Sequence, residues 1–490
     1  MKKIFIETVF LFLSYLCISI VYITENGNKT NNNELFKTSE DIELFEDIEL
    51  LEEYNQFNGE ASTMTLNTSQ GAVFYYYGLK KYFVFTPTES MIMDLNYNGP
   101  NASLKVYDIH YFASNDYLFY SSNLAYDYDL LYLCTNQQYL FEFTSLTSSL
   151  SSMSITPTKV TSLDNHEKFL MHVTYDSSSA LGYHYDIEYK NINLNSCSNT
   201  IEYINSSNGV TQYYDLLSNT LNFNLDNDNR VMVSNPGELE YSAISYVEAN
   251  GIVIDDQNLQ YTVGSRGTGT FVDGTTVLSC AHIFYSNAEI NGTSYGYLPS
   301  SMTFYPGANS YFDSNSFYQT FGIFTATNSY VPISYLIYGN DSQYDWSISL
   351  TTNTYSGSSN HSYMRMVSFE GTYGNQVQFA GYPALYNCPT NDQDKYRYTM
   401  WTSYPLYNSI TSSDNKIYST DIISTGGNSG APMFIFSSGI ENGHVYYGCY
   451  QIGIVVAVYQ EMINGKYHFN SSVSCKIRPV IINAYYEITS

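Results

Sequence analysis

The sequence predicts an all-β protein with two or three folded units. Tyrosine, asparagine and serine fill polar positions that lysine and glutamate usually fill: there are 53 tyrosines among 490 residues, and only 13% of residues are charged. Tyrosine fits the pleated, half-buried surface of a sheet, where lysine and glutamate are depleted. Short runs that alternate apolar and polar residues recur along the chain, such as Tyr82–Thr86 and Tyr139–Thr144, and this alternation is typical of strands. A chain of this length is long for one domain.

Residues 1–24 are predicted to be a secretory signal peptide. Two lysines precede a mostly apolar stretch from Ile4 to Ile23, and polar residues follow it, as in signal sequences. An uncleaved membrane anchor is the alternative, because no small-residue cleavage site is evident. This segment is the one membrane contact that we expect. A signal peptide directs export, so we expect the protein to be secreted or extracellular.

Six cysteines follow the signal segment, and in an exported chain they can form disulfides. We expect Cys134 to pair with Cys197. A second disulfide is expected within the set Cys280, Cys388, Cys449 and Cys475.

The segments after the signal peptide differ in character. Residues 25–60 carry an acidic run and are expected to be a solvated linker, or a pro-segment that masks a surface until it is cleaved. Alternating runs separated by turn residues predict a β-sandwich-like domain over residues 61–157. Residues 158–222 continue in this style and are expected to be a β-rich pro-region or accessory segment. From residue 223 glycines become denser, and residues 476–490 have the apolar spacing of a closing helix.

Charge and spacing argue against several kinds of partner. The formal net charge of −27 at pH 7 disfavours nucleic acid and anionic membranes. A candidate zinc motif fails because His172 lies six residues after His166, whereas two histidines on a metal-binding helix are four residues apart. We therefore expect no metal and no cofactor.

The stretch STGGNSGAPMF, Ser424–Phe434, surrounds Ser429 with the glycines Gly426, Gly427 and Gly430. Glycine weakens helices and strands, and it is favoured where the backbone takes positive φ or approaches another group closely. A serine framed in this way is a candidate nucleophile, and the N–H groups of its loop are candidate hydrogen-bond donors.

Two further residues supply the base and the carboxylate that a serine nucleophile needs. An apolar strand predicted at 276–279 leads through two small residues to His282, and Asp345 opens another apolar strand. Alone, each of these residues is more often a structural residue than a catalytic one. The order His282, Asp345, Ser429, however, is that of the chymotrypsin-type triad and differs from the order in subtilisins and α/β-hydrolases.

Several motifs around these residues resemble one protease family. VLSCAH at 277–282 resembles the histidine motif of trypsin-like serine proteases, and GGNSGAP at 426–432 resembles their serine motif. The wider context is similar to the glutamyl-endopeptidase branch of that family, through residues 228–230, 380–383, 399–401 and 452–454. The resemblance covers about residues 223–490. It implies a trypsin-like serine protease domain with a chymotrypsin-type double β-barrel and a closing C-terminal helix.

The resemblance also implies roles and a maturation step. His282 takes the proton of Ser429, Asp345 orients His282, and the N–H groups of Gly427 and Ser429 form the oxyanion hole. Residues 224–230 resemble the segment near which mature proteases of this branch begin. Residues 25–222 are therefore either the pro-region of a zymogen or a permanent accessory domain.

The leading hypothesis is a secreted serine endopeptidase, with protein or peptide substrates as its partners and a monomer as its expected state. The first alternative is a secreted non-catalytic binding or adhesion protein on a protease-like fold. A serine esterase is the second alternative.

Specificity is where the sequence departs from the glutamyl branch. The histidine and threonine that receive the substrate carboxylate in that branch correspond to Val455 and Ser424 here. A glutamate carboxylate buried unpaired against Ile423 and Val455 costs several kcal/mol, and Val458 narrows the mouth of the pocket. We expect a small or medium apolar side chain at the cleaved position, and not glutamate.

Overall fold

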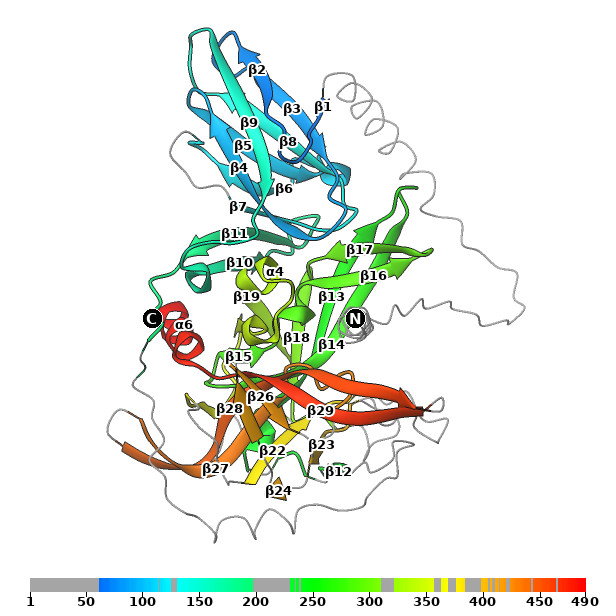
Figure 1. Cartoon of the computed structure of the whole chain (residues 1–490), viewed down its shortest axis with the longest axis vertical. Coiled ribbons are helices and arrows are strands. Elements are labelled where there is room, and N and C mark those ends of the chain that lie inside the picture. The colour runs from blue at the N-terminus through cyan, green and yellow to red at the C-terminus, as the bar shows by residue number, and fades with distance from the viewer. Residues whose placement is uncertain are drawn as a thin grey trace, which may run out of the picture.

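The computed structural model describes residues 61–112, 114–124, 130–195, 197, 230–233, 235–237, 239–309, 321–356, 363–368, 376–383, 398–403, 406–407, 410–413, 415–419, 424–441, 444–463 and 466–490. The predicted signal peptide and acidic segment, as well as Cys388 and Ile423, lie outside these residues. Strands dominate the described chain, with a sandwich at one end and two barrel-type sheets at the other (Figure 1). No helix in the described ranges has the length and apolar character needed to cross a membrane.

The N-terminal strands form a sandwich of two sheets. A five-stranded sheet has the order β1-β3-β8-β5-β6, and a four-stranded sheet has the order β2-β9-β4-β7. Tyr97 of one sheet stacks on Phe143 of the other, with ring centroids 6.3 Å apart. The elements are β1 (Ser62–Thr63), β2 (Gln70–Phe74), β3 (Lys80–Phe85), β4 (Met91–Asn98), β5 (Ala102–Asp108), η1 (Ile109–Tyr111), β6 (Tyr117–Ser121), β7 (Leu130–Leu133), β8 (Tyr139–Ser145) and β9 (Ser151–Lys159).

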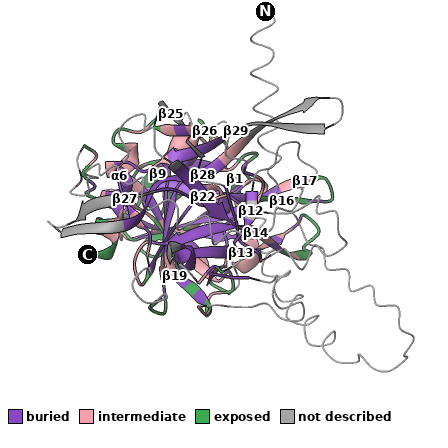
Figure 2. Cartoon of the chain, turned by 90° about the horizontal axis from the view of Figure 1, so that it is seen from below, coloured by how far each residue is buried: buried purple, intermediate pink, exposed green. Residues whose placement is uncertain are grey.

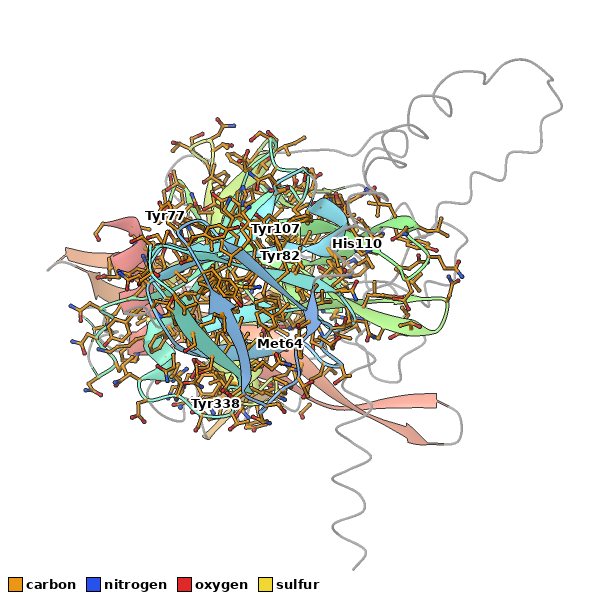
Figure 3. The ribbon with its side chains drawn as sticks, turned by 90° about the horizontal axis from the view of Figure 1, so that it is seen from above. Met64, Tyr77, Tyr82, Tyr107, His110 and Tyr338 are labelled. Carbon is orange, nitrogen blue, oxygen red and sulfur yellow. The ribbon has the colours of Figure 1, made fainter. Side chains whose placement is uncertain are left out.

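The alternation seen in the sequence separates two faces of the five-stranded sheet. Phe83 and Phe141 belong to the large core cluster, whereas Tyr82, Tyr107 and Leu140 form a small cluster of their own. Figure 3 labels Tyr82 and Tyr107 of the small cluster. Because side chains point to opposite faces at successive positions of a strand, the sheet buries apolar residues on both sides.

Six strands of the next region close into a barrel. Along the eight-stranded sheet the order β19-β18-β13-β14-β15-β20 is continuous, and an additional pairing of β19 with β20 closes the ring. The barrel strands are largely buried (Figure 2). The elements are η3 (Leu239–Ala243), β13 (Ile244–Ile254), β14 (Gln260–Phe271), β15 (Thr276–Ser279), η4 (Ala281–Ile283), β16 (Ser286–Ile290), β17 (Thr293–Tyr297), β18 (Ser301–Pro306), β19 (Phe324–Pro332), α4 (Ser334–Ile337), η5 (Ser342–Tyr344) and β20 (Ser347–Thr351).

The second barrel-type sheet has ten strands, eight of them in the order β12-β23-β22-β27-β28-β29-β26-β25, with β24 paired to β22 and β21 to β28. The predicted closing helix follows it, with Pro479 at its first turn, where proline is favoured. The elements are β12 (Arg230–Met232), β21 (Arg365–Met366), β22 (Gln376–Gly381), β23 (Trp401–Ser403), β24 (Leu406–Tyr407), β25 (Ile410–Ser413), β26 (Lys416–Ser419), β27 (Pro432–Glu441), β28 (His444–Ile463), β29 (Lys466–Lys476) and α6 (Pro479–Thr489). The predicted fold class, an all-β chain with a chymotrypsin-type double β-barrel after a β-sandwich, is confirmed.

A hairpin between the sandwich and the barrels joins them. Its strands are β10 (Phe169–Tyr175), which follows η2 (His166–Lys168), and β11 (Tyr183–Tyr189). β10 pairs antiparallel with β19 of the closed barrel, and one hydrophobic cluster runs from the sandwich through this hairpin into the barrel. The hairpin therefore extends the sheet of the closed barrel and shares its core.

The predicted disulfide between Cys134 and Cys197 is wrong. No disulfide joins the described cysteines, Cys134, Cys197, Cys280, Cys449 and Cys475. Cys134 is instead a thiol in the core shared by sandwich and barrel, and burial raises its pKa to about 12. The prediction of a pair among the last four cysteines is wrong for the three that are described; Cys388 lies outside the described residues.

Arg478 links the N-terminal region to the loop before Asp345. Arg478, at the start of α6, forms an ion pair with Glu167 of η2, with 2.7 Å between Nη1 and Oε1. Its Nη2 also donates to the carbonyl of Gln343, at 2.9 Å. The Arg478 side chain is 10% exposed, so a lost partner would leave a charge with little solvation.

Replacing Arg478 by methionine is expected to lower the free energy of unfolding by about 3 kcal/mol, because it leaves Glu167 poorly solvated and unpaired. Urea unfolding followed by the fluorescence of the buried Trp346 and Trp401 measures this. The matched control is Lys159→Met, which breaks the exposed pair with Glu89 and should cost less than about 1 kcal/mol. Equal losses in both variants would contradict the expectation.

Candidate active site

Strand pairing explains how His282 and Asp345 meet. β15 and β20 are antiparallel neighbours, with Ser279 opposite Ser347. His282 lies in η4, just beyond the end of β15, and Asp345 lies just before the start of β20. The two residues therefore extend from adjacent strand ends.

His282 and Asp345 form a well-defined pair. The distance from Nδ1 of His282 to Oδ2 of Asp345 is 2.7 Å. The other carboxylate oxygen, Oδ1, accepts the backbone N–H groups of Ala281 at 2.7 Å and His282 at 3.0 Å. Asp345 is 3% exposed. Because the carboxylate accepts a proton-bearing Nδ1, the neutral ring keeps its lone pair on Nε2.

The surroundings of His282 act on its pKa in opposite directions. Burial lowers the pKa, whereas the negative charge of Asp345, the Cys280 thiol and hydrogen bonds to both residues raise it. The net result is a pKa well above the usual value. The ring must lose a proton before it can act as a base, and Asp345 is the main group that holds this proton.

The loop that carries Ser429 is anchored on β14 by backbone contacts. The N–H of Thr268 donates to the carbonyl of Ser429 at 2.7 Å, and the Thr268 hydroxyl donates to the carbonyl of Gly427 at 3.0 Å. The N–H of Gly430 donates to the carbonyl of Val455 on β28 at 2.8 Å. One loop is thus held between the two barrels.

Glycine is required at two positions for this anchoring. Gly430 has φ +85°, and a methyl group there would overlap the carbonyl of Thr268 and the hydroxyl of Ser279. On β14, a methyl group on Gly267 would overlap Ile283, beside His282, and the carbonyl of Ser429. The glycines therefore let the serine loop lie against the strand next to the histidine.

The N–H groups of Gly427 and Ser429 are among those of the loop that have no acceptor in the described residues. The N–H of Asn428 donates to Thr425, and that of Ala431 donates to Asn428. No hydrogen bond engages the N–H of Gly427 or Ser429. These are the two donors that the sequence predicts for the oxyanion hole.

The third contact of the predicted triad is not formed. Between the described residues His282 and Ser429 there is no hydrogen bond, and Nε2 of His282 instead has Sγ of Cys280 as its partner, at 3.6 Å. Catalytic hydrogen bonds are often long in enzymes without substrate and tighten when it binds. The structure thus joins His282 to Asp345 and places Ser429 in a loop that lies against β14, the neighbour of β15.

A small pocket lies beside Ser429. The residues that line it are Ser424, Thr425, Gly426, Ser429, Val455, Val456, Ala457 and Val458. The space open to the centre of a water molecule is about 10 Å³, which is room for about one water. In its wall the Ser472 hydroxyl donates to the Ser424 hydroxyl at 2.9 Å. Of the predicted specificity residues, Ser424, Val455 and Val458 meet here, and Ile423 lies outside the described residues.

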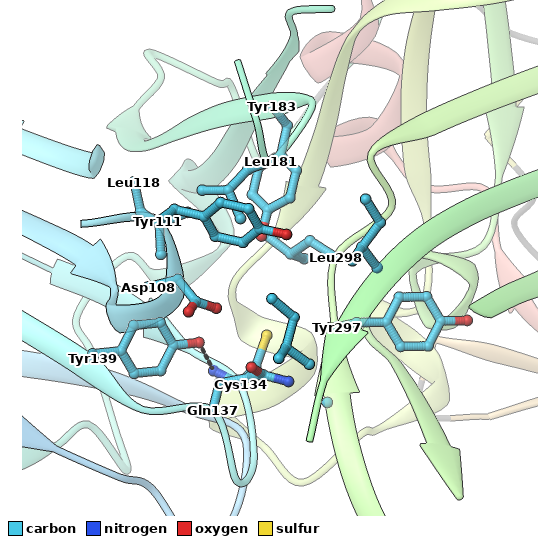
Figure 4. A pocket seen from close by; sticks show the side chains of 13 residues that line it. Asp108, Tyr111, Leu118, Cys134, Gln137, Tyr139, Leu181, Tyr183, Tyr297 and Leu298 are labelled. Carbon is cyan, nitrogen blue, oxygen red and sulfur yellow. Dashed lines mark hydrogen bonds between the residues drawn. The ribbon is translucent and has the colours of Figure 1, made fainter. Parts of the chain in front are cut away.

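A second pocket lies between the sandwich and the closed barrel and contains none of the predicted site residues (Figure 4). Asp108, Tyr139 and Cys134 face it from the sandwich, and Tyr297 and Leu298 face it from the barrel side. The Cys134 N–H donates to the Tyr139 hydroxyl at 2.8 Å. This pocket is part of the shared interior of the two units.

Comparison with known proteins gives structural neighbours only. No family model and no curated protein matches the sequence. The chain is similar to a Glu endopeptidase in complex with MPD, at 21% identity and a TM-score of 0.36, over 54% of this chain and 99% of the other. It is similar to the protease Anisep from Arthrobacter nicotinovorans, at 17% identity and a TM-score of 0.33, over 52% of this chain and 98% of the other. It is also similar to the scabies mite inactivated protease paralogue S-I1, at 12% identity and a TM-score of 0.31, over 51% of this chain and 95% of the other. The fold assignment rests on the strand pairing described above.

Sequence reasoning missed Thr268 as a residue of the site. Its hydroxyl donates to the carbonyl of Gly427 and accepts a hydrogen bond from the N–H of Tyr382 at 3.0 Å. Its backbone N–H donates to the carbonyl of Ser429, and its carbonyl accepts from the Ser279 hydroxyl. The signal in the sequence is weak: Thr268 lies between two glycines, and only its pairing with the serine loop gives it a role.

Replacing Thr268 by valine is expected to lower kcat by about 10- to 100-fold, because the Gly427 peptide loses the bond that orients it and one oxyanion donor is worth at most about 10³-fold. The variant keeps the shape of the side chain. Thr270→Val is the matched control on the same strand, since the buried Thr270 hydroxyl has no hydrogen-bond partner among the described residues. The measurement is kcat for both variants on a peptide substrate. An equal loss of kcat in both would contradict a positioning role for the Thr268 hydroxyl.

Proposed function

We propose that this chain is a secreted serine endopeptidase. The observation that carries the proposal is the His282–Asp345 pair, in which a carboxylate held by two backbone N–H groups fixes the imidazole 2.7 Å away. This arrangement leaves Nε2 as the basic atom, and it occurs beside a glycine-framed serine. The fold alone does not establish an activity, so the proposal depends on these side chains.

The mechanism uses the chain's own groups. His282 Nε2 accepts the proton of the Ser429 hydroxyl while Oγ attacks the scissile carbonyl, and Asp345 stabilises the imidazolium that results. The N–H groups of Gly427 and Ser429, which have no other acceptor among the described residues, donate to the oxyanion. The imidazolium then gives its proton to the leaving amine, and water hydrolyses the acyl-enzyme by the same route.

A fluorophosphonate probe combined with protein hydrolysis tests this function. We expect the full secreted chain to be labelled covalently at Ser429 and to cleave an unfolded protein such as casein. Labelling without peptide hydrolysis, but with ester hydrolysis, would favour the esterase alternative. Absence of both would favour the non-catalytic binding protein. N-terminal sequencing of the secreted product tests export and any removal of preceding residues.

The pocket beside Ser429 supports a preference for small or medium apolar side chains at the cleaved position. Val455 is 2% exposed and provides no charge or hydrogen bond to a carboxylate, and the space is about that of one water molecule. The Ser424 hydroxyl accepts a hydrogen bond from Ser472, and its own O–H offers a carboxylate one neutral donor and no charge. A glutamate side chain would exchange its hydration for an apolar wall.

Peptides that differ only at the cleaved position measure this preference. We expect kcat/KM for alanine or valine to exceed that for glutamate by about 100-fold, because an unpaired buried carboxylate costs about 3 kcal/mol. Val458→Gly should widen the pocket and raise the rate for phenylalanine relative to alanine. Fastest cleavage after glutamate would reject the preference while leaving the endopeptidase proposal intact.

A further inference from the structure

Cys280 touches the catalytic histidine, yet the proposed hydrolysis does not use it. It lies at the start of η4, is fully buried, and its Sγ is 3.6 Å from Nε2 of His282. In the described part of the chain, Cys280, His282 and Asp345 are the one group of three metal-ligating residues whose ligand atoms all lie within 4.8 Å of one another.

The distance between Sγ and Nε2 matches one edge of a tetrahedral zinc site. Zinc binds cysteine sulfur at about 2.3 Å and histidine nitrogen at about 2.0–2.1 Å. At a tetrahedral angle these two bonds place sulfur and nitrogen about 3.5 Å apart. The two atoms are 3.6 Å apart, so both can bind one ion with a small rotation of the side chains.

Asp345 suits the role of an outer partner of this ion. Zinc-bound histidines commonly donate their other ring N–H to a carboxylate, which fixes the tautomer and strengthens the ligand. Here Oδ2 of Asp345 accepts from Nδ1, and Oδ1 is occupied by two backbone N–H groups. Asp345 therefore prepares Nε2 as a ligand and is not itself free to bind the ion.

Access to the site is through the histidine. The His282 side chain is 24% exposed, whereas Asp345 on its Nδ1 side is 4% exposed. Because Cys280 and Asp345 are buried, His282 is the one residue of the three that solvent reaches.

We propose that Sγ of Cys280 and Nε2 of His282 together bind Zn²⁺ and that the bound ion inhibits the enzyme. The thiol and the protonated imidazole ring each release a proton to solvent, S–Zn and N–Zn bonds replace the contact between Sγ and Nε2, and water completes the coordination. No electron is transferred, because zinc has no redox chemistry. With its lone pair on zinc, Nε2 cannot accept the proton of Ser429. The inhibitory consequence rests on the proposed function, whereas the binding of zinc does not.

Cobalt titration of the full chain carrying Ser429→Ala tests binding without any activity readout. We expect a thiolate-to-cobalt absorption band that saturates at one ion per chain and disappears when zinc is added in competition. Cys280→Ala should abolish the band, and Cys280→Ser serves if the alanine variant does not fold. Cys197→Ala, at a partly exposed cysteine of the N-terminal region, should leave it unchanged. Asp345→Asn should weaken binding about 10- to 100-fold.

Zinc inhibition of peptide hydrolysis is the second measurement, with the rate of each variant expressed relative to its own rate in chelator. We expect zinc to inhibit the unmodified chain reversibly, and Cys280→Ala to be at least about tenfold less sensitive, as one ligand is lost. A thiolate band that persists in Cys280→Ala, or no band with cobalt in excess, would overturn the site. Binding with no peptidase activity in chelator would reject the proposed function and leave the zinc site standing.

Discussion

Ser429→Ala is expected to lower kcat for peptide hydrolysis by about 10⁶-fold, since no acyl-enzyme can form without the hydroxyl. KM should change little. The loop is held through main-chain atoms, the Ser429 carbonyl to Thr268 and the Gly430 N–H to Val455, and these bonds do not need the Ser429 side chain. The N–H groups at the predicted oxyanion hole also remain, so a residual rate above that in water is expected.

Ser424→Ala is the matched control for this variant. Ser424 lies in the same stretch and is 2% exposed, but its hydroxyl accepts a bond from Ser472 in the pocket wall. It should retain fluorophosphonate labelling and most of kcat. If Ser429→Ala kept its labelling or its turnover, the nucleophile would be another residue and the proposed mechanism would fail.

The pairing of His282 with Asp345 could be predicted from the order of His282, Asp345 and Ser429 along the chain and from the resemblance of the motifs around them. The sequence 276–279 reads as a strand that ends just before a histidine, and β15 has these bounds. The glycine cluster likewise indicated positive φ, which Gly427 and Gly430 adopt. Local signals were sufficient for the strand end and for the tight turn, because these are properties of a few consecutive residues.

Contacts between distant segments could not be predicted in this way. The hairpin β10–β11 has the same alternation as the sandwich strands, and nothing local distinguishes its pairing with β19 from pairing within the sandwich. The role of Thr268 could not be predicted either, because its hydroxyl contributes to the site only through its hydrogen bond to Gly427 in the distant serine loop. The disulfide prediction for Cys134 failed because export and an even cysteine count do not state which cysteines are in the core.

Asp345→Asn is expected to lower kcat at neutral pH by about 10⁴-fold, because the ring loses the partner that fixes its tautomer. Asp345 now accepts at both oxygens, from Nδ1 of His282 and from the N–H groups of Ala281 and His282. An amide has one acceptor and one donor end, so asparagine must present its NH₂ group to one of these donors. Either the imidazole ring of His282 flips, or the hydrogen bonds from the backbone N–H groups of Ala281 and His282 are lost.

The pH profile distinguishes this role of Asp345 from a merely structural one. Neutral His282 is the active base, and because its pKa is raised well above the usual value, kcat/KM of the unmodified chain should rise with pH through that raised pKa. Removing the carboxylate charge leaves burial, which lowers the pKa of His282, so the rise should move to lower pH in Asp345→Asn. Asp341→Asn, on the same loop but paired with Lys416 at 2.6 Å, should keep the original profile. An acid limb that stays in place in Asp345→Asn would mean that the carboxylate does not hold the proton of the catalytic base.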